Sequence, residues 1–215
     1  MNLHSILIAC FLLAFFGTGR AQVNPDVKEQ PPKKDDHNHQ HDRPPLGKPP
    51  EKIEWAAAKK LSWKDYKGKY DDTRKLPAMT FIATYYNHFQ NKKGDSVHIE
   101  VVPIFYPTDS YIKSDLKTKA ALENAQVLFD LYEVWARKLR KEFVVSQFQV
   151  ATYSTYMQAM YKANLQARNS EILKFKTDTK DGKDAEKQKV WAAKIKKELT
   201  DLAAYNKKNI RVRIK

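Results

Sequence analysis

The second half of the chain repeats its apolar positions with the period of an α-helix. Between Leu116 and Phe143 the apolar side chains recur mostly at spacings of three and four, which is typical of a helix with one buried face. The same pattern predicts a second helix over about 145–167. After the polar stretch 177–182 it predicts a third helix over about 184–205.

The segment before these helices has the composition of β-strands. Residues 80–90 and 97–106 are rich in β-branched and aromatic side chains, and Gly94 lies between them, so we expect a β-hairpin. Because Pro103 has no N–H to donate, we expect the second strand at a sheet edge or at a bulge. Residues 210–214 alternate like a further strand. The predicted fold class is α+β: a helix-dominated single domain with an N-terminal β-hairpin or small antiparallel sheet.

The N-terminus has the pattern of an export signal. Residues 6–16 form an unbroken apolar run, which is shorter than the roughly 20 residues that a membrane-spanning helix needs. Small residues follow, so we predict a signal peptide over 1–21, cleaved before Gln22. Two alternatives stay open: a retained anchor, and lipidation at Cys10. After cleavage no cysteine and no transmembrane helix would remain, and the protein is expected to be secreted or periplasmic.

Residues 22–50 differ in composition from both of their neighbours. They are rich in proline and charge and poor in apolar side chains, so we predict an extended, disordered tether. Within it His37, His39 and His41 are flanked by aspartates, and imidazoles beside carboxylates can hold zinc, copper or nickel weakly. The alternative is a solvated linker that happens to be rich in histidine.

The excess positive charge lies on the domain, residues 51–215. The chain carries +14, of which Arg20 contributes one, and the tether's five basic residues balance five acidic ones, which leaves +13 for the domain. Such a domain favours an anionic partner. Because there is no helix-turn-helix, zinc-finger spacing or RNA-binding aromatic motif, we expect anionic envelope polymers rather than nucleic acid. The sequence does not reveal whether the domain has a protein partner.

Three segments of the domain together resemble one bacterial family. Residues 61–68 read L-S-W-K-D-Y-K-G, residues 124–140 read N-A-Q-V-L-F-D-L-Y-E-V-W-A-R-K-L-R, and residues 175–182 read F-K-T-D-T-K-D-G. In this order they resemble L-T-W-x-D-F-K-G, H-E-x-x-H-F-D-I-x-E-x-x-A-R-K-L-R and Y-D-x-E-T-x-H-G of the domain of unknown function 922 family. Members of that family are predicted secreted zinc peptidases. The resemblance implies a zincin-like scaffold.

The residues that would perform the family's chemistry are missing. In an H-E-x-x-H helix the two histidines hold zinc from one face, and the glutamate polarises the attacking water. Here the two histidine positions carry Asn124 and Leu128, the glutamate position carries Ala125, and the later family histidine is replaced by Asp181. Leucine offers no lone pair and alanine accepts no proton. We therefore expect no catalytic residue, metal or cofactor in the domain, with Ala125 and Leu128 packed into its core.

Two functions are compatible with these residues. The first is a non-catalytic binding or structural protein of the envelope, a pseudoenzyme in which Glu133 pairs with Arg137 one helical turn away. The second is a secreted hydrolase that uses other residues. Against the second, the domain has no cysteine, no G-x-S-x-G motif and only two histidines, His88 and His98, which could face each other across the hairpin. The sequence favours the first.

Overall fold

The structure, a computed structural model, describes residues 50–215. Residues 1–49, with the predicted signal peptide, Cys10 and the tether histidines His37, His39 and His41, lie outside the described residues. The strands are β1 (Ile53–Glu54), β2 (Ala78–Met79), β3 (Ile82–Gln90), β4 (Ser96–Phe105), β5 (Tyr111–Ile112) and β6 (Asn209–Arg213). The helices are α1 (Lys119–Val145), α2 (Tyr153–Thr179) and α3 (Ala185–Asp201). The predicted α+β class, rich in helix with a small antiparallel sheet, is confirmed.

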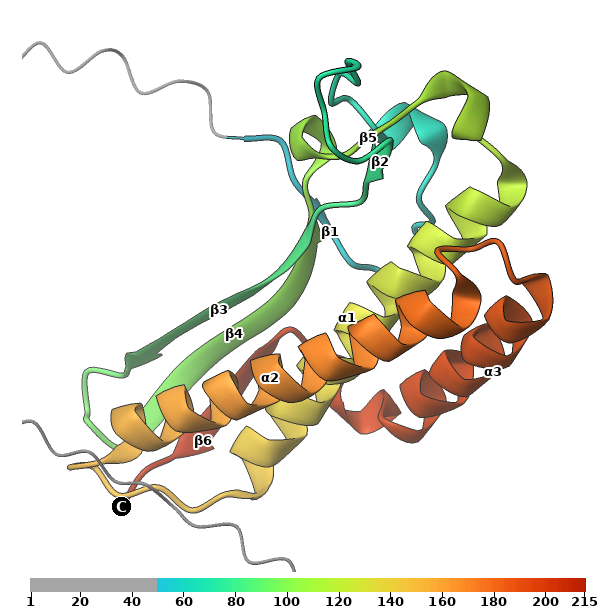
Figure 1. Ribbon diagram of the computed structural model, residues 1–215. Helices are drawn as coiled ribbons and strands as arrows, with labels where there is room; N and C mark the ends of the chain where they lie inside the picture. The colour runs from blue at the N-terminus through green and yellow to red at the C-terminus, as the bar shows by residue number, and fades with distance from the viewer. Residues whose placement is uncertain (1–49) are drawn as a thin grey trace, which may run out of the picture. The chain divides into compact units, whose positions relative to one another are not determined.

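The main sheet is built around β4. Strand β3 pairs along one side of β4 as the predicted hairpin, while β1 and β6 pair with opposite ends of its other side, all antiparallel (Figure 1). The prediction that Pro103 places this strand at an edge is wrong, and its register with β3 runs without a bulge. The Pro103 carbonyl accepts from the Trp55 N–H at 3.0 Å, so the nitrogen of Pro103 faces the same side of β4, just past the last paired residue of β1. The missing N–H therefore lies where this strand pairing already ends.

Helix α1 is the centre of the helical layer. It contacts β3, β4 and β6 as well as α2 and α3 (Figure 1). Because α1 has neighbours on several sides, its buried residues are not confined to one face of the helix. They include the charged Glu133, Arg137 and Arg140. Of the described helices, none is long and apolar enough to span a membrane.

The predicted bounds of the second helix are wrong. Helix α2 begins eight residues later than expected and continues to Thr179, because residues before it run beside the C-terminal strand, where Phe148 bridges Ile214. Three of the five residues that α2 buries are the polar Asn164, Arg168 and Thr179. The spacing of apolar residues therefore did not reveal that the helix continues through its second half. The left-handed Lys180 (φ 50°) then ends the helix.

The segment Leu61–Gly68 forms a tight turn against the loop that follows β4. The Asp65 carboxylate accepts hydrogen bonds from both the backbone N–H and the hydroxyl of Ser62, at 2.7 and 2.9 Å. Gly68 donates its N–H to the carbonyls of Pro107 and Ser110 at 3.1 and 2.9 Å. A Cβ built on Gly68 would lie only 2.7 Å from the Ser110 carbonyl oxygen. The glycine of this motif is therefore required for a close backbone approach.

We expect Gly68→Ala to destabilise the domain by about 1–3 kcal/mol, because the clash is with backbone rather than with a flexible side chain. The measurement is urea unfolding followed by circular dichroism. Lys67→Ala, at the exposed neighbouring position, is the control and should change stability by about 0.5 kcal/mol or less. Equal stability of the two variants would mean that the loop relaxes freely.

The two histidines of the hairpin do not face each other. His88 pairs with Ile99 and His98 pairs with Phe89, so the imidazoles lie on opposite faces of the sheet. His88 stacks on Tyr86 with ring centroids 5.4 Å apart, and burial lowers its pKa. His98 stacks on Phe89 at 5.1 Å. Both histidines therefore act as packing residues.

Candidate functional site

The positions that match the family's metal motif are filled by packing. Ala125 and Leu128 are buried, with 5 % and 7 % of their surface exposed, and they belong to a core cluster with Phe175 and Trp191. The Asn124 amide donates to the Thr179 hydroxyl at 3.3 Å. Two of the motif positions therefore pack in the core, and the third forms a hydrogen bond to the end of α2.

The turn between α2 and α3 packs directly on the same position. A Cβ built on Gly182 would lie 3.0 Å from the Cβ of Asn124, so the turn that carries Asp181 is held against α1. Asp181 itself is exposed, in a left-handed conformation (φ 53°). Within residues 50–215 no three His, Cys, Asp or Glu side chains are grouped so that they could hold a metal.

Asp178 connects the end of α2 to α3. Its carboxylate accepts from the Lys174 ammonium at 2.9 Å and from the Trp191 indole N–H at 3.0 Å. The hydrogen bond from Lys174 and then that from Trp191 lower the pKa of Asp178. The indole of Trp191 meets the Phe175 ring edge to face. This part of the sequence motif therefore holds two helices together.

One helical turn beyond the motif, α1 carries a buried ion cluster, which we call the Glu133 triad: Glu133, Arg137 and Arg140. Glu133 accepts from the Arg137 Nε–H at 2.8 Å, which confirms the predicted pair. It also accepts from Arg140 at 3.0 and 3.1 Å, a partner that the sequence analysis missed. Arg140 lies seven residues from Glu133, nearly two full turns, so the helical period alone could have placed it on the same face.

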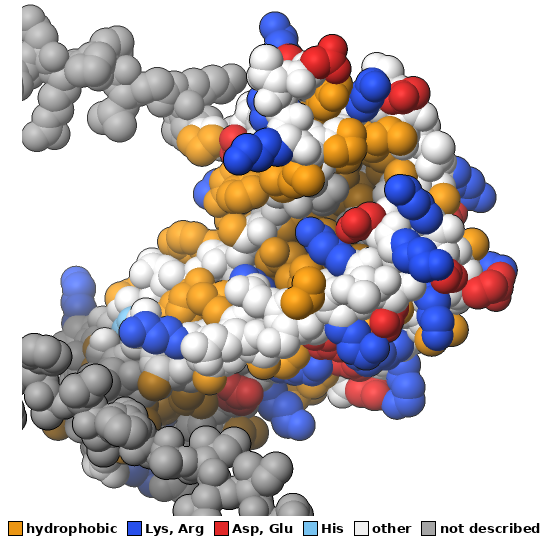
Figure 2. Space-filling view, in the orientation of Figure 1, with side chains coloured by type: hydrophobic (Ala, Val, Ile, Leu, Met, Phe, Trp, Pro, Cys, Tyr) orange, Lys and Arg blue, Asp and Glu red, His pale blue; other side chains and the backbone are white. Residues whose placement is uncertain are grey.

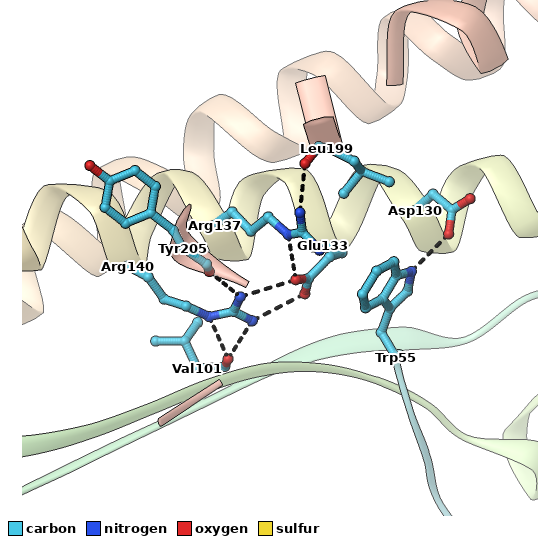
Figure 3. Close-up of polar contacts among 8 residues, drawn as sticks. All are labelled: Trp55, Val101, Asp130, Glu133, Arg137, Arg140, Leu199 and Tyr205. Atoms are coloured by element: carbon cyan, nitrogen blue, oxygen red, sulfur yellow. Dashed lines mark hydrogen bonds and ion pairs between the residues drawn. The ribbon is translucent and has the colours of Figure 1, made fainter. Parts of the chain in front are cut away.

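Arg140 connects α1 to the main sheet through hydrogen bonds. Its guanidinium donates to the Val101 carbonyl on β4 and to the Tyr205 carbonyl that follows α3, besides Glu133 (Figure 3). The Val101 carbonyl faces the break between β1 and β6, where none of the strands in residues 50–215 supplies a donor. Arg140 therefore supplies the hydrogen bonds that a missing strand residue would have made there.

A cleft of about 630 Å³ opens beside the triad, between α3 and the chain that follows β1; we call it the Trp55 cleft. The Trp55 indole N–H donates to Asp130 at 2.7 Å, and the Arg137 guanidinium lies 5.3 Å from the indole ring (Figure 3). On the α3 side the cleft is lined by Ala192, Ile195 and Leu199. A second hollow of about 330 Å³ adjoins it and shares Trp55, Ala57 and Arg137.

The two hollows are lined by more basic than acidic side chains. The basic ones are Lys60, Arg137, Arg140, Lys196, Lys207 and Lys208, and the acidic ones are Asp130 and Glu133. Both acids already accept hydrogen bonds from protein groups. Elsewhere basic residues are spread over the face drawn in Figure 2, with acidic ones between them. The cleft thus combines local positive charge with apolar walls.

No family model, no curated protein and no solved structure matches this chain.

Proposed function

We propose that this chain is a non-catalytic binding protein of the bacterial envelope, built on a zinc-peptidase-like scaffold whose metal site has been replaced by core packing. The observation that carries the proposal is the burial of Ala125 and Leu128 where that scaffold would hold its glutamate and second histidine. The contact between Asn124 and the turn of Asp181 supports it, because the positions of the family's ligands meet in space.

The Trp55 cleft is where such a protein would bind its ligand. The carboxylates that line its hollows, Asp130 and Glu133, accept structural hydrogen bonds from Trp55 and Arg137 and are not paired with each other as acid and base. Its basic lining suits the anionic envelope polymers that the net charge favours.

The test is the zinc content of the full chain together with its peptidase activity. We expect well under one equivalent of zinc by elemental analysis after dialysis, and no cleavage of unfolded protein substrates. Zinc that persists should disappear in a variant with His37→Ala, His39→Ala and His41→Ala, which removes the predicted tether ligands. A stoichiometric, chelator-resistant zinc in that variant, or activity that a chelator abolishes, would contradict the proposal.

A further inference from the structure

The Glu133 triad carries one positive charge in excess. A single carboxylate lies between two guanidinium groups, and the three residues are exposed by only 1 %, 6 % and 1 % in chain order. A buried charge without a counter-charge is unfavourable unless an anion or strong dipoles compensate it. The carbonyls of Val101, Leu199 and Tyr205 supply dipoles. Among the described residues, Glu133 is the one carboxylate that forms an ion pair with either arginine.

The two arginines differ in how many of their donors are used. A guanidinium has five N–H groups, and the bonds of Arg140 to Val101, Glu133 and Tyr205 involve all three of its nitrogens. Arg137 donates through Nε to Glu133 and through Nη1 to the Leu199 carbonyl. In the part of the chain that the structure describes, its Nη2 has no hydrogen-bond partner, and Arg137 lines both hollows of the cleft. The unpaired donors of the triad thus lie on the arginine that lines the cleft.

We infer that the Trp55 cleft binds an acidic ligand, a carboxylate or phosphate carried on a ring-shaped or apolar body. Its acid group pairs with the free donors of Arg137, which suit a planar or tetrahedral oxyanion. The body of the ligand lies against Trp55 and the apolar side chains of α3, and Lys60 and Lys196 add charge at the rim. The inference rests on the proposed binding function and names the chemistry of its ligand.

The test is a two-dimensional NMR titration of the full chain with benzoate, phenyl phosphate and benzamide. The Trp55 indole N–H, which donates to Asp130 beside the cleft, is the reporter and is assigned by its loss in Trp55→Phe. We expect both acids to shift this signal saturably and the neutral benzamide, of nearly the same shape, to leave it in place. The acid that binds more tightly identifies the source as carboxylate or phosphate.

Two variants connect the binding to the named residues. Arg137→Lys keeps the charge opposite Glu133 but loses the planar donors, and should weaken acid binding at least about tenfold. Lys196→Ala, on the exposed surface of α3, should weaken it a few-fold without disturbing the fold. Its matched control is Lys197→Ala, whose ammonium pairs with Asp201 and does not line the cleft, and which should bind as the unaltered chain does.

Benzamide binding as tightly as benzoate would overturn the inference. So would unchanged affinity for both acids in Arg137→Lys and Lys196→Ala together. The zinc content of the same preparation reports separately on the proposed function. A zinc-bearing, active peptidase that still bound benzoate through Arg137 would overturn the proposed function and leave the assignment of the cleft standing.

Discussion

Glu133→Gln is expected to destabilise the domain by about 3–5 kcal/mol, which is the usual result of removing one partner from a buried ion cluster. Glutamine keeps the shape of the side chain but leaves Arg137 and Arg140 as two buried positive charges with no carboxylate between them. For a domain of this size such a loss lowers the melting temperature by roughly 10 °C. Calorimetry of the variant beside the unaltered chain measures both quantities.

The matched control is Glu123→Gln on the same helix. Glu123 is exposed and forms only an i,i+4 surface pair with Lys119, at 3.7 Å. Exposed pairs of this kind contribute at most about 0.5 kcal/mol, so the control should melt close to the unaltered chain. If Glu133→Gln melted at the same temperature as the control, the triad would not need its carboxylate, and the excess positive charge of the triad would have to be reconsidered.

Leu128→His should destabilise the domain by about 2–4 kcal/mol and should create no peptidase activity. Leu128 is buried in the core cluster that also contains Phe175 and Trp191. An imidazole there would be left without an assured hydrogen-bond partner, at a cost of about 1–3 kcal/mol, and lost leucine packing adds to that. Thermal unfolding and a peptidase assay on the same variant test both halves of the prediction.

Leu173→His provides the comparison, because Leu173 is 67 % exposed on α2 and should accept histidine with little change in stability. Activity should require at least Asn124→His, Ala125→Glu and Asp181→His in addition to Leu128→His. The close contact between Asn124 and Gly182 makes the first of these costly as well. An unchanged melting temperature in Leu128→His would mean that the position is not core, contrary to its burial.

The sequence allowed the fold class, the hairpin and the first and third helices to be predicted, because each depends on local periodicity. It could not give the bounds of α2, where buried polar residues such as Arg168 break the apolar pattern. Nor could it reveal that β4 is central, since β6 reaches it from more than 100 residues away along the chain.

In the candidate site too, local contacts could be predicted from the sequence and contacts between distant segments could not. The pair of Glu133 and Arg137 follows from helical spacing alone. The indole of Trp55 hydrogen-bonds Asp130, which is 75 residues away along the chain. Lys60 and Lys196 line one cleft only because α3 folds back beside the chain that follows β1. A cleft formed by segments so distant in sequence leaves no local pattern to be recognised.

Because β6 is the last strand to be synthesised, the main sheet can be completed only at the end of synthesis. Strand β6 pairs with the first half of β4, from Ser96 to Glu100, and the backbone of Lys215 bonds to Phe148 and Val150. Until residues 209–213 have left the ribosome, that half of β4 has an unpaired edge, bordered by Val97 and Ile99. Open, apolar strand edges are sites of misassociation between chains. We therefore expect a chain that lacks β6 to associate with other chains more readily than one in which β6 is in place.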